Sequence, residues 1–204
     1  MSRRRFNTVQ KSCGWKHAYD HIKAKYGTVC ADELFDRASE LYGTYSSRYK
    51  GEKGVRKGHV LGAVSVSSLY IPLSELTGKG EAKDLIAESM RPVSVAKHNK
   101  IERLPAPVFM RVAGFITGRI FSEKAGFKRN WHCNTNREKS YDLLTCPYVK
   151  TFNELGCPEV CPSVCIQDDI SFGNLKNGVV FERKGTLGRG DSCCDFCFRI
   201  SGKE

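Results

Sequence analysis

The chain has 204 residues, of which 40% are hydrophobic, and it carries a formal net charge of +11 together with ten cysteines. This composition is too apolar for a disordered chain and too interrupted by charge for a membrane span, so we expect one compact domain and no membrane contact. Residues 1–130 hold 24 Lys and Arg against 12 Asp and Glu, a net charge of +12, whereas eight of the cysteines follow residue 130. The domain therefore divides into a basic part, residues 1–130, and a cysteine-rich part, residues 131–204.

The start of the chain predicts a cytoplasmic protein. Arg3 to Arg5 are followed by polar residues and not by the apolar run of a signal peptide. Cytoplasmic thiols stay reduced, so we expect the cysteines to be catalytic, metal-binding or buried and not paired in disulfides.

Helices are predicted throughout the basic part. Apolar residues recur at helical spacing over residues 31–49, and a glycine-rich, basic loop at 51–58 separates this helix from the next. The second helix, from His59 to about Leu76, contains Pro72, which predicts a kink or an end near Tyr70. Two further helices are expected over residues 81–98 and 108–121.

The cysteine-rich part predicts a small antiparallel sheet with a helical insertion. We expect strands at 138–146, 179–184 and 193–200, and the last two are joined by the loop 185–191. Short helices are expected at 148–155 and from Pro158 towards Phe172. A helical layer followed by such a sheet is an α+β fold.

Three cysteines, Cys157, Cys161 and Cys165, follow one another at four-residue spacing. Pro162 predicts that a helix starts here, with Cys161 at its N-cap and Cys165 on the first turn. A thiol near a helix N-terminus has a lowered pKa, and its thiolate is the better nucleophile and metal ligand. Asp168 lies on the same side as Cys165, so a thiol and a carboxylate can line one cavity. The alternative is that these cysteines are small buried hydrophobic residues.

The last predicted strand has two different faces. Alternation places Cys194 with the apolar Phe196 and Phe198, whereas Cys193, Asp195, Cys197 and Arg199 share the other face. Cys194 is then a packing residue unless a pocket opens onto its face. Asp195 requires a hydrogen-bonded or exposed environment.

Metal binding is a competing use of the thiols, in which Cys161 and Cys165 contribute to a zinc or iron site. The spacing lacks the two close cysteine pairs that are typical of zinc sites, so no cofactor is the first expectation. The charge pattern is that of solvated helix faces and not of a nucleic-acid-binding motif.

The cysteine-rich part resembles the L-2-amino-thiazoline-4-carboxylic acid hydrolase family. Three segments carry the resemblance: Cys146-Pro-Tyr, Glu154 to Asp168, and Thr186 to Phe198. The resemblance implies an α+β fold of a kind related to vinyl-reductase-type ligand-binding domains, with Cys146, Cys165, Asp168, Cys194 and Asp195 at the family's recurring positions. Cys197 stands where the family has arginine, and Cys193 is an additional thiol.

The family's substrate is a cyclic isothiourea, whose hydrolysis at a carbon–nitrogen bond needs a nucleophile, a carboxylate for the amidine nitrogens and a cation for the substrate carboxylate. We assign Cys165, or else Cys194, as the nucleophile, and Asp168 and Asp195 as the carboxylates. Substrate binding is assigned to Arg183, Arg199 and Cys146. The expected partner is a small molecule, anionic or tethered to a carrier protein, and the chain is compatible with a homo-oligomer. A ligand-binding or metal-binding module without turnover is the alternative function.

Overall fold

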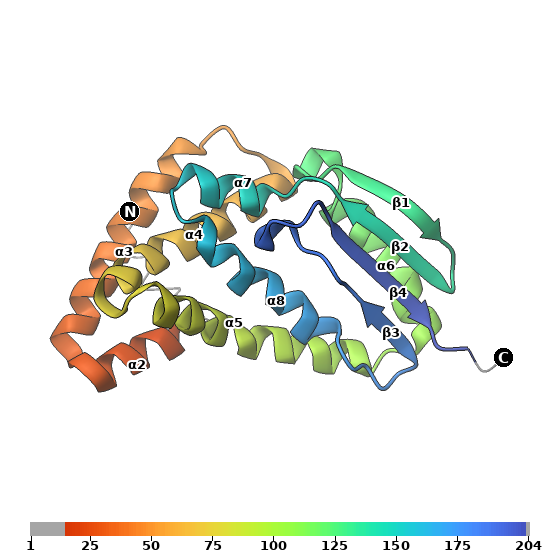
Figure 1. Cartoon of the computed structure of the whole chain (residues 1–204), viewed down its shortest axis with the longest axis horizontal. Coiled ribbons are helices and arrows are strands. Elements are labelled where there is room, and N and C mark those ends of the chain that lie inside the picture. Colours follow the sequence, from red (N-terminus) through yellow and green to blue (C-terminus); the bar gives the residue numbers. More distant parts are fainter. Residues whose placement is uncertain (1–14, 203–204) are drawn as a thin grey trace.

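Long helices form the first part of the chain in the computed structural model, which describes residues 15–202 (Figure 1). Arg3 to Arg5 and Cys13 lie outside the described residues. The helices are α2 (Lys16–Tyr26), α3 (Thr28–Arg48), α4 (Gly54–Thr77), α5 (Lys79–Glu102) and α6 (Ala106–Ile120). Gly27 and Gly78 join successive helices at φ values of 90° and 84°, a backbone region that favours glycine.

Helix α4 corrects two predictions. It begins at Gly54, inside the predicted loop, and it continues through Pro72 to Thr77 instead of ending near Tyr70. Proline removes one backbone hydrogen bond, but the burial of Leu69, Tyr70 and Leu73 around it favours the continued helix.

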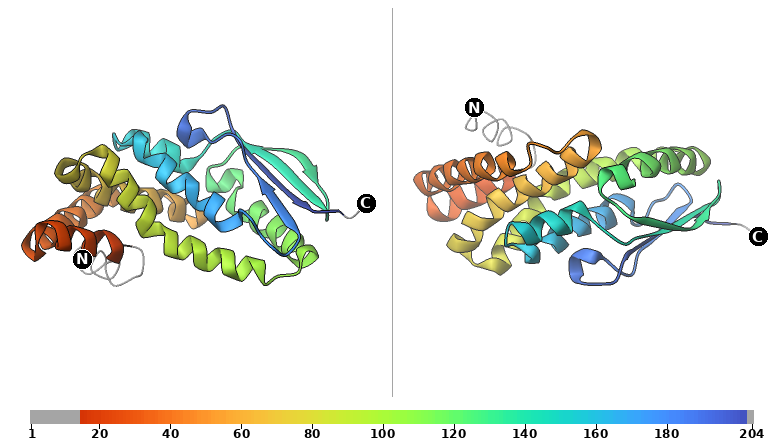
Figure 2. Two further views of the ribbon diagram at one scale, coloured as in Figure 1. Left: turned by 60° about the horizontal axis from the view of Figure 1, so that its bottom comes forward. Right: turned by 90° about the horizontal axis from the view of Figure 1, so that it is seen from above.

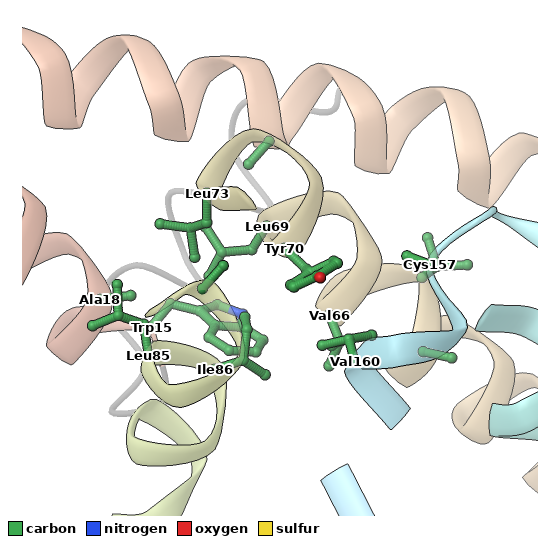
Figure 3. Close-up of a cluster of buried hydrophobic side chains, with 14 of the residues drawn as sticks. Trp15, Ala18, Val66, Leu69, Tyr70, Leu73, Leu85, Ile86, Cys157 and Val160 are labelled. Atoms are coloured by element: carbon green, nitrogen blue, oxygen red, sulfur yellow. The ribbon is translucent and has the colours of Figure 1, made fainter. Parts of the chain in front are cut away.

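Helix α4 lies at the centre of the larger hydrophobic cluster. It packs against α3, α5 and α7 (Pro147–Glu154). Figure 3 shows Leu69 and Leu73 of α4 in one cluster with Leu85 and Ile86 of α5. By length and composition α4 also qualifies as a membrane-crossing helix, but 56% of its most apolar window is buried inside the protein. The same test is passed by core helices of soluble proteins, so this finding adds only weak support for a span.

The second part contains a four-stranded antiparallel sheet, which confirms the α+β prediction. The strands are β1 (Arg129–Asn134), β2 (Glu138–Leu143), β3 (Val179–Glu182) and β4 (Cys194–Ile200), in the order β1-β2-β4-β3. Helices α7 and α8 (Cys161–Phe172) are inserted between β2 and β3. Short 3-10 turns lie at Glu123–Ala125, Pro158–Val160 and Leu187–Arg189.

Strand β1 was not expected from the sequence. Its residues are mostly polar, and its pairing with β2 is irregular between Trp131 and Cys133, which breaks the two-residue periodicity. The aromatic side chain of Trp131 packs on Tyr141 of β2, with ring centroids 4.9 Å apart.

The sheet has one covered and one open face, as the alternation in β4 predicts. Cys194, Phe196 and Phe198 are buried on the covered face. Figure 2 shows the sheet with helices on one side. Helix α8 packs along α5 and also contacts the Leu187–Arg189 turn, so the first turn of α8 meets the loop between β3 and β4. This junction positions the candidate site.

Candidate active site

Two thiols lie together at the start of α8. The helix begins at Cys161, with Val160 as its N-cap, so Cys161 is the first helical residue and not the predicted N-cap. Pro162 is the second residue of the helix, where a backbone N–H has no acceptor within the helix, so the missing N–H of proline costs no hydrogen bond. The four-residue spacing brings the Cys161 and Cys165 sulfur atoms to 3.9 Å, and Cys161 is buried while Cys165 is partly accessible.

Gly188 closes over this thiol pair. A Cβ atom at this position would stand 2.7 Å from the Cys165 Sγ and 2.8 Å from the Cys161 Sγ, so no larger residue fits without displacing the thiols. The Gly188 backbone N–H acts to lower the pKa of the Cys165 thiol. The preceding N–H, of Leu187, donates to the Cys194 Sγ at 3.2 Å.

Arg183 follows β3 and joins it to α8. Its side chain is only 2% exposed, and Nη2 donates to the Cys165 carbonyl oxygen and to Asp169 Oδ2, both at 2.8 Å. Nη1 lies 3.4 Å from Asp168 Oδ2. The guanidinium carbon is also 5.1 Å from the centroid of the Phe196 ring. These Arg183 contacts are all with protein groups, so we assign Arg183 as a positioning residue and not as a substrate-binding residue.

The environment favours a thiolate on Cys165. Its pKa is lowered, chiefly by the hydrogen bond from Cys161 and also by the Arg183 charge and the Gly188 N–H, against the effect of burial. The pKa of Cys161 is raised by the same hydrogen bond and by burial. When the pair loses one proton, the remaining proton is therefore held by Cys161 and the charge by Cys165.

Two further cysteines, Cys146 and Cys194, lie close enough for their charges to affect this pair. Burial raises the pKa of Cys146 to about 12, against the effect of the backbone N–H groups at the start of α7. Burial raises the pKa of Cys194 to about 11. Both thiols stay protonated at neutral pH, which distinguishes them from Cys165 as nucleophiles.

Asp168 lies one helical turn after Cys165 and lines a groove between α5 and α6. The α5–α6 groove has a volume of about 700 Å³, and its lining includes Val93, Lys97, Ile101, Val112, Ile116 and Phe196. The Asp168 side chain is 32% exposed, and burial raises the pKa of this carboxyl despite the opposing charges of Lys97 and Arg183. A carboxyl with a raised pKa is suited to donate and accept protons.

Lys97 was missed by the sequence reasoning, because one lysine in a basic helix carries no distinguishing signal. Its Nζ lies 4.2 Å from the centroid of the Phe172 ring. Partial desolvation lowers its pKa, and Asp168 opposes this. The groove thus presents a carboxylate and an ammonium group at one place.

The other predicted residues lie on the open face of the sheet. Asp195 Oδ1 accepts the backbone N–H groups of Lys184 and Gly185 at 2.9 and 2.6 Å, so it fixes the start of the loop that carries Gly188. Arg199 is exposed and pairs with Glu182 at 2.5 Å. The structure therefore does not bring Asp195 or Arg199 to the Cys165 thiol.

Within residues 15–202, no group of three or more His, Cys, Asp or Glu side chains is arranged to hold a metal ion. Cys161 and Cys165 have the proximity that the metal hypothesis requires, but no third ligand joins them there.

Comparison with known proteins gives one family match. Residues 59–198 match the family described as L-2-amino-thiazoline-4-carboxylic acid hydrolase. No curated protein and no solved structure matches the chain. The matched region covers more than half of the chain and includes α8, Arg183 and the Gly188 loop, so the chain belongs to the L-2-amino-thiazoline-4-carboxylic acid hydrolase family.

Proposed function

We propose that this protein is a thiol-dependent hydrolase that opens a small cyclic amidine or isothiourea, such as 2-amino-thiazoline-4-carboxylate, at a ring carbon–nitrogen bond. The observation that carries the proposal is the Cys161–Cys165 pair, in which one thiol hydrogen-bonds the other beneath Gly188 and beside Arg183. This arrangement favours ionisation of Cys165, and a thiolate is the nucleophile that such a hydrolase needs.

The first half of the reaction forms a covalent intermediate. The Cys165 thiolate adds to the carbon between nitrogen and sulfur of the protonated amidine, which the Asp168 carboxylate binds through the amidine nitrogens. Asp168 then carries a proton from the exocyclic amino group to the ring nitrogen, and the ring carbon–nitrogen bond breaks. The carbon is left bonded to the Cys165 sulfur, the substrate sulfur and an imino nitrogen.

The second half consumes one water. The water oxygen bonds to the carbon and one of its protons passes to the imino nitrogen. Asp168 accepts the remaining hydroxyl proton as the bond to Cys165 breaks. Asp168 then passes this proton to the amine of the product, so that the thiolate and the carboxylate are restored, and the product is a ring-opened thiocarbamate. Lys97 is placed to bind the substrate carboxylate, because it shares the groove with Asp168.

The test is incubation of the purified protein with 2-amino-thiazoline-4-carboxylate, followed by mass spectrometry of the products and of the intact chain. We expect a product heavier by one water and an adduct on Cys165. Turnover should persist in protein that elemental analysis shows to be free of metal. A stoichiometric metal whose removal abolishes turnover would contradict the mechanism, and ligand binding without turnover would favour the binding-module alternative.

The pH dependence of kcat/KM tests the thiol pair. The acidic limb of the profile follows formation of the Cys165 thiolate, whose pKa is lowered by the S–H group of Cys161. Cys161→Ala removes this donor, so the pKa of Cys165 rises and the limb moves to higher pH. Cys161→Ser keeps a donor, and its limb should stay near that of the wild type. Equal profiles for all three proteins would show that Cys161 does not act on the nucleophile.

We further propose a cytoplasmic location, where the free thiols stay reduced, and a small-molecule substrate as the partner. The substrate is an anion or is tethered to a carrier. Nucleic acid is not proposed as a partner, because the cations are distributed over helices with acidic neighbours.

A further inference from the structure

The α5–α6 groove extends well beyond the charged pair at Asp168 and Lys97. Its volume of about 700 Å³ falls in the range of roughly 300–1,000 Å³ that holds drug-sized ligands. The amino-thiazoline carboxylate is a single small ring with two substituents. Such a molecule leaves most of the groove empty.

The rest of the groove is lined by hydrophobic side chains. Phe196, Phe198 and Tyr141 of the sheet contribute to the lining, together with Phe109 of α6 and Phe172 of α8. An aromatic surface of this kind favours an apolar group over water.

The helices on either side of the groove leave apolar side chains uncovered. Val93 of α5 is 59% exposed, and Val112 and Ile116 of α6 are 40% and 43% exposed. Helix α6 contacts β2 and β4 of the sheet, and Figure 1 shows it behind these strands, away from the run of α5 along α8. The protein therefore has an apolar surface between the two helices that a bound group can cover.

Charge limits what the ligand can be. The groove presents the Asp168 carboxyl for a basic amidine and the Lys97 and Lys100 ammonium groups for an acid. A ligand without a polar head would cover these charged groups without a hydrogen-bond partner of its own, and a ligand without an apolar portion would leave the aromatic lining uncovered.

We infer that the natural substrate is a cyclic amidine that bears a hydrophobic substituent, with its amidine at Asp168 and its substituent in the α5–α6 groove. This inference rests on the proposed function, since the groove shares Asp168 with the proposed site. It places the specificity of the enzyme in Ala113, Ile116 and their neighbours on α6.

The experiment measures binding of acetamidine, butanamidine and hexanamidine by isothermal titration calorimetry. Affinity should rise by roughly three- to four-fold for each added methylene group that enters the groove. Ala113→Phe places a ring in the groove and should weaken hexanamidine binding at least ~10-fold, with little effect on acetamidine. Asp168→Asn should weaken the whole series.

Val108→Phe is the matched control, because Val108 is an exposed α6 residue outside the groove lining. It should bind the series as the wild type does, and both variants are checked for folding by circular dichroism. Affinity that does not change with chain length overturns the inference. A second result would also overturn it. If the protein is a dimer, and Val112→Asp dissociates the dimer without changing the affinity for hexanamidine, then a second copy of the chain occupies the groove.

The outcome is separable from that of the proposed function. If binding depends on chain length but the protein has no hydrolase activity, the groove is confirmed as the binding site and the proposed reaction is wrong. If the protein hydrolyses amino-thiazoline carboxylate but binding does not depend on chain length, the proposed reaction is confirmed and the role of the groove is wrong.

Discussion

Replacing Cys165 by alanine is expected to lower turnover of amino-thiazoline carboxylate by at least ~10³-fold, because the variant lacks the atom that forms the covalent intermediate. The chain should still fold, since Cys165 is only partly buried and the substitution removes a single sulfur atom. The measurement pairs steady-state kinetics with thermal unfolding and intact-protein mass spectrometry. The adduct seen with the wild-type chain should be missing from the variant.

Cys194→Ala is the matched control for this prediction. Cys194 is a second thiol of the same neighbourhood, but it is buried and its pKa is raised to about 11, so it stays protonated at neutral pH. Its replacement should leave kcat within a few-fold of the wild-type value. Loss of the adduct in Cys194→Ala, with full activity in Cys165→Ala, would assign the nucleophile to β4 and not to α8.

Arg183→Met should have the largest effect on stability. The substitution keeps much of the apolar volume but leaves Asp168, Asp169 and the Cys165 carbonyl oxygen without their guanidinium donor. Removing one member of a fully buried ion pair costs about 3–5 kcal/mol. The two carboxylates here are 32% and 45% exposed, so we expect a loss of about 2–3 kcal/mol in the free energy of unfolding at pH 7.

The loss should depend on pH in a defined direction. Without Arg183, the pKa of Asp168 rises further, so the folded state binds protons more tightly than the unfolded state does. The penalty is complete while the carboxylates are ionised in the folded state. It shrinks as the pH falls through the raised folded-state pKa of Asp168 and is absent below about pH 4, where both states are protonated. Urea unfolding at several pH values measures this difference.

Arg199→Met provides the comparison, because Arg199 is an exposed arginine on the open face that pairs only with Glu182 among the described residues. Its replacement should leave stability and kcat/KM unchanged within error. A similar loss in both variants would mean that general charge, and not the contacts of Arg183 with α8, stabilises the fold.

The periodicity of the chain was sufficient for much of the fold. Helices α3, α5, α6, α7 and α8 and strands β2, β3 and β4 lie where apolar spacing and prolines predict them, within a few residues. Sequence periodicity failed to predict the elements in which tertiary contacts outweigh the local conformational preference. Burial around Pro72 carries α4 past a helix-breaking residue, and pairing with β2 creates β1 from a polar segment with an irregular register.

The sequence by itself determined that Cys161 and Cys165 can share one helix face, because four-residue spacing places two side chains on one face, and that Asp168 follows one turn later. It did not separate them from Cys157, which has the same spacing but precedes α8 and donates a hydrogen bond to Ser67. It also determined that Cys194 and Asp195 face opposite sides of the sheet, because side chains alternate along a strand. Only the tertiary structure decided which other groups join them. Arg183, Gly188 and Lys97 come from a strand end, a loop and a distant helix, and their meeting with α8 depends on packing between elements far apart in the chain. Local spacing carries no information about such contacts, so a side chain that is buried and ion-paired, as Arg183 is, cannot be distinguished in the sequence from an exposed one such as Arg199.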